Sequence, residues 1–138
     1  MADRFERVQV PLAVAVGGAL GSLLRWGLAT VLVTDGFPVA TFSANISGAF
    51  ALGIVLVVGE LVGSRQHRHH RRPWARLWRP FLATGVLGGF TTFSTFVLEV
   101  DRLDPAIAGL YLVASVALGL LAYSLGNTVA RRWFEVNA

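Results

Sequence analysis

The residues best suited to binding an ion lie in one uncharged stretch, GGFTTFSTF, from Gly88 to Phe96. Phenylalanine alternates there with hydroxyl side chains, and Phe90, Phe93 and Phe96 recur every three residues. An aromatic ring has a negative face and a positive edge, so ring edges attract an anion. Hydroxyl groups add O–H donors without a full positive charge. This mixture suits a narrow passage for a small anion, because conduction requires binding that also permits release.

Three glycines, Gly85, Gly88 and Gly89, accompany this stretch. Each weakens a helix by about 1 kcal/mol relative to alanine. Non-helical backbone inside a membrane persists only where protein or water satisfies its polar groups, and such breaks often form ion sites from freed carbonyls. The glycines therefore predict a helix that is broken near Gly88. The alternative is a packed aromatic stripe, with the hydroxyl groups bonded to their own helix.

Two further polar side chains lie in apolar surroundings. Asn45 shares a helix face with Thr41 and Gly48, and lipid offers its amide no hydrogen-bond partner. Asn45 therefore either bonds to a neighbouring helix or donates to an anion in a conduction path. Arg25 follows glycines at four-residue spacing. Its guanidinium either reaches the membrane interface or faces a wet cavity, where it attracts anions.

A polar face also recurs every four residues near the end of the chain, beginning at Tyr111 and Ser115 and continuing through Gly119 and Tyr123. Small and polar residues at this spacing usually allow helices to pack closely in lipid. The same face would also serve as one wall of a polar track. Both interpretations of Ser115 remain open at this point.

Composition predicts the elements that carry these residues. Hydrophobic residues make up 54% of the 138-residue chain and charged residues only 14%, whereas soluble domains average about 25% charged residues. A hydrocarbon core about 30 Å thick requires roughly 20 helical residues. We therefore expect an all-α membrane protein with four transmembrane helices in a single domain, residues 1–138. The predicted spans are 8–33, 39–62, 80–100 and 105–130, with a basic loop over 63–79.

Arginine is distributed unevenly between the two sides of the predicted membrane. An even number of spans puts both termini on the same side as the loop 63–79. Of the 12 basic residues, all but Arg25 and Arg102 lie on that side. Short loops rich in arginine remain in the cytoplasm, so both termini are predicted to be cytoplasmic. The loop also contains His67, His69 and His70, which either bind a metal or belong to a basic segment facing anionic lipid headgroups.

Three motifs, taken together and in this order, resemble the Fluc (CrcB) family of fluoride channels. They are Gly17-Gly18-x-x-Gly21-x-x-x-Arg25, Thr41-x-x-x-Asn45-x-x-Gly48-x-Phe50-x-Leu52-Gly53, and Gly85-x-x-Gly88-Gly89-Phe90-Thr91-Thr92-Phe93-Ser94-Thr95-Phe96. The resemblance covers all four spans and leaves out the tails and the loop 63–79. It implies a channel of the bacterial cell membrane that passively exports toxic cytoplasmic fluoride.

The resemblance also implies a dimer of two antiparallel subunits with two fluoride pores. Phe93 and Phe96 would then present ring edges to fluoride in each pore. Asn45 would line the same path, together with the hydroxyl groups of Ser94, Thr95 and Ser115.

A structural sodium ion that is not transported is implied at the dimer centre. Its ligands would be the backbone carbonyls of Gly88 and Thr91. Arg25 and Glu99 would lie near the aqueous vestibules of the pore.

The arginine bias bears on the dimer partner. An antiparallel homodimer requires each chain to insert in both orientations, which needs nearly balanced arginine on the two sides. This chain is therefore expected to insert in one orientation and to pair with a second, homologous subunit of opposite bias. A homodimer is the alternative.

Other function classes would leave different marks on the sequence. A proton-coupled small multidrug exporter would carry a glutamate in its first span, whereas Glu60 and Glu99 lie near span ends, where solvation is expected. A passive assembly subunit without transport is a further alternative. An intramembrane enzyme is not expected, because every histidine lies in the loop and no Ser–His pair can form within the bilayer.

Overall fold

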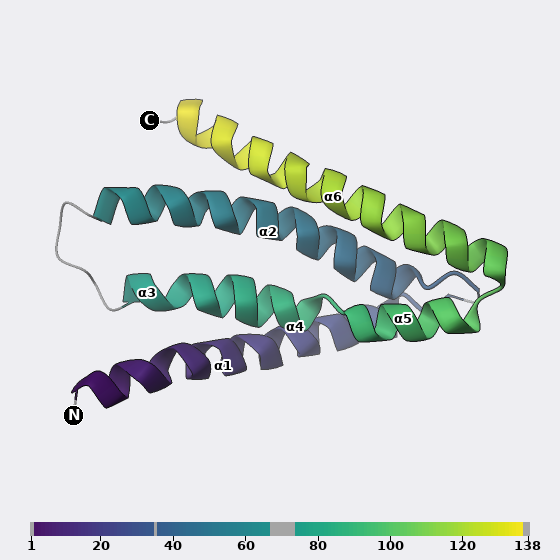
Figure 1. The fold of residues 1–138 in the computed structure, drawn as a ribbon, viewed down its shortest axis with the longest axis horizontal. Helices are drawn as coiled ribbons and strands as arrows, with labels where there is room; N and C mark the ends of the chain where they lie inside the picture. Colours follow the sequence, from purple (N-terminus) through teal and green to yellow (C-terminus); the bar gives the residue numbers. More distant parts are fainter. Residues whose placement is uncertain (1, 35, 67–73, 137–138) are drawn as a thin grey trace.

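The structure is a computed structural model that describes residues 2–34, 36–66 and 74–136. All regular structure in these ranges is helical (Figure 1), which confirms the predicted all-α fold. The elements in chain order are α1 (Ala2–Val31), α2 (Val39–Gln66), α3 (Trp74–Arg79), η1 (Pro80–Leu87), α4 (Gly88–Phe90), α5 (Phe93–Arg102) and α6 (Pro105–Val136). Seven of the residues in the predicted basic loop, 67–73, lie outside the described ranges, and His67, His69 and His70 are among them.

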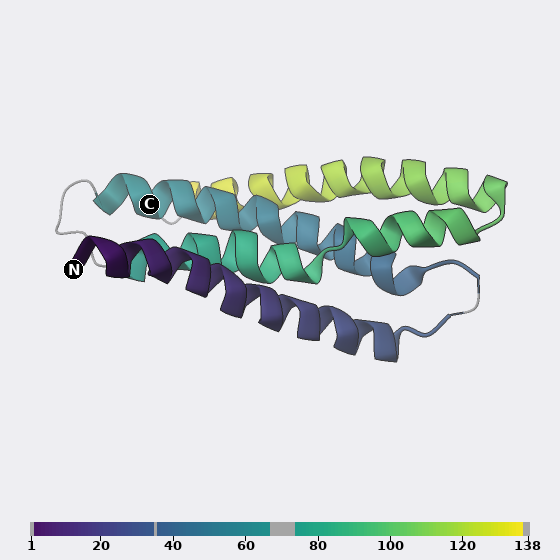
Figure 2. The same ribbon diagram turned by 60° about the horizontal axis from the view of Figure 1, so that its bottom comes forward.

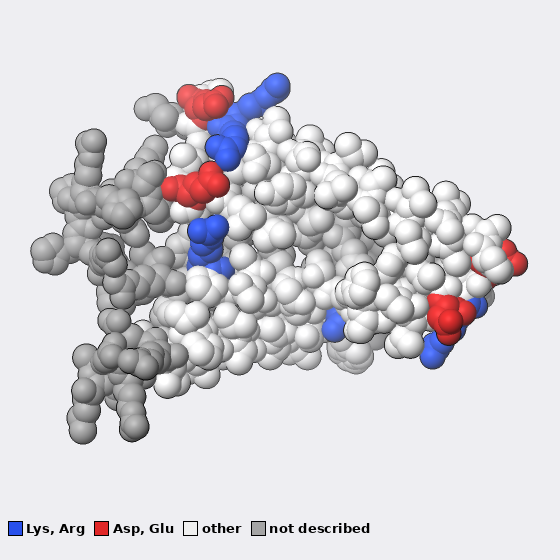
Figure 3. Space-filling view, viewed as in Figure 1, with Lys and Arg blue, Asp and Glu red and all other residues white. Residues whose placement is uncertain are grey.

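Four stretches are long and apolar enough to cross a membrane, namely Val8–Val31, Val39–Leu61, Leu77–Arg102 and Pro105–Val136. The predicted number of spans is therefore confirmed. The space-filling view shows charged side chains gathered mainly at the two ends of the molecule, with a broad and mostly uncharged band between them (Figure 3). The chain is thus a multi-pass membrane protein, because such a band matches the hydrocarbon region of a bilayer.

Successive spans alternate in direction, but the closest neighbours are not successive. The helix α1 packs mainly against η1 and α4 of the third span, and α2 packs mainly against α6 (Figures 1 and 2). Both of these pairs are parallel. The first turn of α1 and the last turn of α6 lie at the same end of the bundle as the end of α2 and the start of α3.

Glycines allow the backbones of α1 and the third span to touch. A Cβ atom on Gly17 would collide with the carbonyl of Phe81, and one on Gly85 would lie 2.9 Å from the Cα of Gly17. Further along the same contact, a Cβ on Gly21 or Gly89 would also collide with backbone of the opposite helix. Small residues at four-residue spacing permit this approach in lipid, where packing rather than hydrophobicity joins helices.

Glycines also allow the backbones of α2 and α6 to touch. A Cβ atom on Gly53 would collide with the carbonyl of Tyr123, and one on Gly126 would collide with the carbonyl of Phe50. Few described side chains are fully enclosed, Val57 and Tyr111 being the largest. Many large apolar side chains of α1 and α6 are exposed instead, as expected for helices that face lipid.

The third span is broken, as predicted, but the break lies beyond Gly88. Gly88 has helical dihedral angles (φ −66°, ψ −34°). Thr91 (φ −79°, ψ 157°) and Thr92 (φ −149°, ψ 125°) are extended. The stretch before the break contains a π-helix, η1, whose wider turn the sequence analysis did not anticipate. Gly85 and Gly89 serve close packing, so the glycines do not themselves form the break.

Candidate functional site

The side chain of Asn45 holds the extended backbone at the break. Its Nδ2 donates to the carbonyl oxygen of Thr92 at 3.1 Å, and the Thr92 N–H donates to Asn45 Oδ1 at 2.8 Å. Beside it on α2, a Cβ atom on Gly48 would collide with the Thr91 methyl group. The residues Asn45 and Gly48 therefore fit α2 to the break by two hydrogen bonds and a close contact.

At the start of α5, side chains accept hydrogen bonds from two backbone N–H groups that would otherwise bond within a helix. Thr92 Oγ1 accepts from the Thr95 N–H at 3.2 Å and so caps the N-terminus of α5. In a continuous helix, the N–H groups of Thr92 and Thr95 would bond to the carbonyls of Gly88 and Thr91. Here they donate to Asn45 and Thr92 side chains instead. The break thus withdraws the usual amide donors from these two carbonyls.

Most of the predicted pore residues meet at one cavity of about 390 Å³. Its lining comes from α2, η1, α4, the break, α5 and α6, and the surface in Figure 3 is hollowed near the middle of the uncharged band. No charged side chain is among the described residues that line it. The predicted site residues on the lining are Asn45, Gly88, Thr91, Phe93, Phe96 and Ser115.

The two phenylalanines of the cavity differ in exposure. Phe93 is 78% exposed and Phe96 is 7% exposed, and their ring centroids lie 6.0 Å apart. Gly88 is also exposed, so the cavity opens to the surface of the single chain. Ser115 Oγ is buried and has no hydrogen-bond partner in the described part of the chain. The lining therefore combines two aromatic rings with a serine whose hydroxyl has no partner among the described residues.

Ser94 and Thr95 are not among the lining residues. Ser94 is exposed, and its hydroxyl lies 3.3 Å from Thr92 Oγ1. Thr95 faces α1, where its Oγ1 accepts from Arg25 Nη1 at 3.5 Å. Arg25 Nε also donates to the carbonyl of Gly89 at 3.2 Å, so the partly buried guanidinium binds the third span on both sides of the break.

Glu99 is held by two hydroxyl groups, which the sequence-based expectation of a solvated side chain did not include. Thr41 Oγ1 donates to Glu99 Oε1 at 2.7 Å, and the Tyr111 hydroxyl donates to Oε2 at 2.8 Å. The Tyr111 ring also packs against Phe96, with centroids 4.9 Å apart. Sequence reasoning missed this cluster, although Thr41 and Tyr111 each occupied a polar helix face that it had noted.

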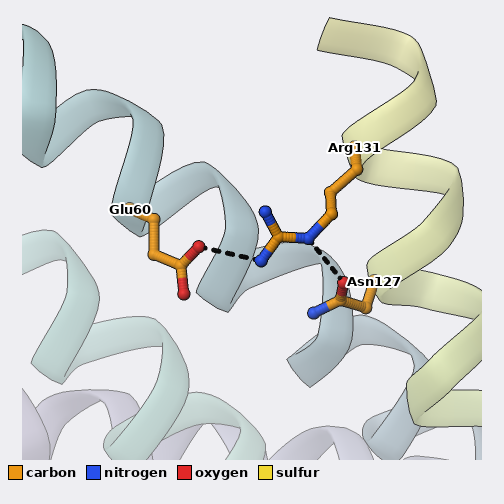
Figure 4. Close-up of polar contacts among 3 residues, drawn as sticks. All are labelled: Glu60, Asn127 and Arg131. Atoms are coloured by element: carbon orange, nitrogen blue, oxygen red, sulfur yellow. Dashed lines mark hydrogen bonds and ion pairs between the residues drawn. The ribbon is translucent and has the colours of Figure 1, made fainter. Parts of the chain in front are cut away.

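Glu60 lies near the far end of α2 and forms an ion pair. Arg131 Nη2 of α6 lies 3.0 Å from Glu60 Oε2, and Arg131 Nε donates to Asn127 Oδ1 at 2.9 Å (Figure 4). The two charged side chains are 57% and 51% exposed. Among the described residues no group of His, Cys, Asp or Glu side chains is arranged to hold a metal ion.

Comparison with known proteins agrees with these motifs. A family model described as "CrcB-like protein, Camphor Resistance (CrcB)" matches residues 12–127. The chain belongs to the CrcB family. The family predicted from the three motifs is thereby confirmed.

Relatives of this CrcB-family chain carry the name "Fluoride-specific ion channel FluC". The protein from Paracoccus denitrificans is 42% identical over 129 residues, which cover 89% of this chain and 95% of the relative. The protein from Beijerinckia indica is 48% identical over 127 residues, covering 87% and 94%. "Fluoride-specific ion channel FluC 2" from Bacillus subtilis is 42% identical over 123 residues, covering 87% and 86%. The homologues of the chain are thus ion channels and not enzymes.

Proposed function

We propose that this chain is a subunit of a fluoride-specific channel that passively exports cytoplasmic fluoride and so relieves its toxicity. One observation carries the proposal: Phe93, Phe96, Asn45 and Ser115 line a single cavity that has no charged side chain on its described lining. The names of the relatives support the choice of fluoride.

The chemistry of this lining suits a small anion. Ring edges and O–H groups present partial positive charge, while a full charge would hold the ion too tightly for rapid release. The hydroxyl of Ser115 has no partner in the described chain and would donate to an ion in the path. Phe93 is largely exposed, so a second subunit would enclose the path on that side. Arg25 and Glu99 would lie nearer the aqueous vestibules.

We also infer that a structural sodium ion binds at the dimer centre, held by the backbone carbonyls of Gly88 and Thr91. Hard cations take oxygen ligands, and the amides that would bond to these carbonyls in a continuous helix donate elsewhere. Gly88 is exposed on the open side of the cavity, where the matching carbonyls of a second subunit could join it. When bound, the ion would supply positive charge at the broken ends of the helices.

The partner we propose is a second, homologous subunit in the antiparallel orientation. All basic residues except Arg25 and Arg102 belong to the side of the termini, which favours one orientation with both termini in the cytoplasm of a bacterial cell. This bias argues for a heterodimer over a homodimer. Tagging each terminus of the chain expressed alone tests the proposal, and an even mixture of orientations would contradict it.

Fluoride loss from liposomes, followed with a fluoride electrode, tests the function. The chain is reconstituted alone and with a homologous subunit of opposite arginine bias, at neutral and acidic pH. We expect fluoride to run down its own gradient in at least one preparation, without a proton gradient. No loss in either preparation, or loss that requires a proton gradient, would contradict the proposal and favour an assembly subunit or a proton-coupled exporter.

A matched pair of substitutions tests the cavity. Phe93→Ile keeps apolar bulk but removes the ring edge, so efflux should fall severalfold while the dimer persists on size-exclusion chromatography. Phe134→Ile makes the same change near the end of α6, away from the cavity lining, and should leave efflux unchanged. Equal efflux in both variants would remove Phe93 from the path.

A further inference from the structure

We propose that Arg25 is a positioning residue for the helix break. Its guanidinium caps the carbonyl of Gly89, and it supports conduction through this hydrogen bond rather than by attracting anions. The proposal rests on the proposed fluoride conduction and adds to it a role for one side chain outside the cavity lining.

The break creates the need for such a cap. In a continuous helix the carbonyl of Gly89 would accept from the N–H of Phe93. The extended dihedral angles of Thr91 and Thr92 end that helix at Phe90. A backbone carbonyl without a partner is costly in an apolar environment. Arg25 Nε supplies the partner, at 3.2 Å from the Gly89 oxygen.

The packing of α1 places Arg25 at this position. Gly17, Gly21 and Arg25 are four residues apart and share one helix face. A Cβ atom on Gly21 would collide with the carbonyl of Val86 and would lie 2.8 Å from the nitrogen of Phe90. The two backbones therefore touch one turn before Arg25, so its side chain has only a short distance to cross to reach the end of the broken helix.

The cap belongs to a chain of hydrogen bonds that crosses the break. Arg25 Nη1 donates to Thr95 Oγ1, which also accepts from Thr92 Oγ1 at 3.1 Å. The backbone of Thr92 is bonded in turn to Asn45 of α2. The positive charge of Arg25 lies against the negative end of the helical segment that finishes at Phe90. Two of the guanidinium nitrogens, Nε and Nη1, therefore donate to groups of the protein.

Two neutral substitutions separate the hydrogen bond from the charge. Arg25→Gln places an amide N–H at the same number of bonds from the Cα atom as arginine Nε. Arg25→Met has similar length but no donor, and both variants lose the charge. If Arg25 acts as a cap, Arg25→Gln should retain fluoride efflux to within about threefold of the unchanged chain, and Arg25→Met should lose about tenfold or more.

A role of Arg25 in attracting anions would give a different pattern of efflux. If Arg25 attracts anions, both variants should lose efflux to the same extent, and the loss should shrink as ionic strength rises. Equal efflux in both variants, whether reduced or unchanged, would overturn the proposal. Failure of Arg25→Met alone to fold would support the cap, because only that variant lacks the donor. Failure of both variants to fold would contradict it.

Hydrogen exchange gives a readout that does not depend on fluoride. In the purified channel, followed by mass spectrometry, the amides of residues 88–96 should exchange faster in Arg25→Met than in the unchanged chain. Arg25→Gln should match the unchanged chain. This measurement tests the cap even if the chain proves not to conduct fluoride. Unaltered exchange in Arg25→Met would overturn the proposal even if fluoride conduction is established.

Discussion

Both parallel helix pairs pack through close glycine contacts, but only one of the pairs contains a broken helix. The pair α2–α6 closes through Gly53 and Gly126, and both helices remain continuous. The pair formed by α1 and the third span closes through glycines such as Gly21 and Gly89, yet the third span breaks shortly after Gly89. Close glycine contact is therefore compatible with an unbroken helix and does not explain the break.

What distinguishes the broken span is the supply of polar partners from other helices. Asn45 bonds to both backbone groups of Thr92, and Arg25 bonds to the carbonyl of Gly89. These side chains replace hydrogen bonds that a continuous helix would make within itself. On α6, by contrast, the buried Ser115 hydroxyl has no described partner, and the helix continues past it.

The largest effect is expected from crowding the glycine contact of α1. Gly21→Ala should lower the free energy of unfolding by about 3 kcal/mol, because the new methyl group collides with the Val86 carbonyl. Gly18→Ala is the matched control on the same helix, since its methyl group would meet open space. The control should be neutral or stabilising by up to about 1 kcal/mol. Chemical unfolding in detergent compares the two, and equal losses would contradict the close contact.

Asn45→Asp tests whether the Asn45 amide holds the broken backbone at Thr92. The carboxylate still accepts from the Thr92 N–H but faces the Thr92 carbonyl without a donor, and it adds negative charge to the proposed anion path. Fluoride efflux should fall by about tenfold or more at neutral pH.

The matched control is Asn127→Asp on α6, where the side chain accepts from Arg131 outside the cavity lining. This variant should conduct like the unchanged chain. Sustained efflux in Asn45→Asp would show that conduction needs Asn45 neither to hold Thr92 nor to line the anion path. A loss in both variants would point to a general effect of added negative charge.

A smaller effect is expected from the hydroxyl groups that hold Glu99. Thr41→Val keeps the shape of the side chain and removes one hydrogen bond to the carboxylate. The free energy of unfolding should fall by about 1.5–3 kcal/mol, the usual range for hydrogen bonds to charged groups. Thr30→Val is the control, because its exposed hydroxyl bonds only to the Gly27 carbonyl of its own helix. A loss no larger than that of the control would show that Glu99 depends little on Thr41.

The smallest effect is expected at the exposed ion pair near the ends of α2 and α6. Glu60→Gln should change the free energy of unfolding by less than about 1 kcal/mol, because both partners are more than half exposed. Added salt should reduce the difference further. A loss comparable with that of Gly21→Ala would mean that end charges, rather than glycine contacts, hold the helix pairs together.

Part of the candidate site could be predicted from the resemblance to the Fluc family. Phe93, Phe96, Asn45 and Ser115 all line the cavity, whereas their residue types alone left a packed aromatic stripe and an interhelical hydrogen bond as alternatives. Thr95 does not line it, although its type is equally suitable. The direction of a hydroxyl depends on where the helix breaks, and the glycines predicted only that the break is near Gly88, without placing it at the following threonines.

The sequence by itself determined the four spans, the uneven arginine and the small-residue spacing, since these depend on residues close together along the chain. Only the tertiary structure decided that the parallel spans pair most closely, that the break lies at Thr91 and Thr92, and that Glu99 accepts two hydroxyl groups. The physical reason is that the deciding hydrogen bonds join residues far apart in the sequence. Arg25 and Gly89 are separated by 64 residues, and Asn45 and Thr92 by 47.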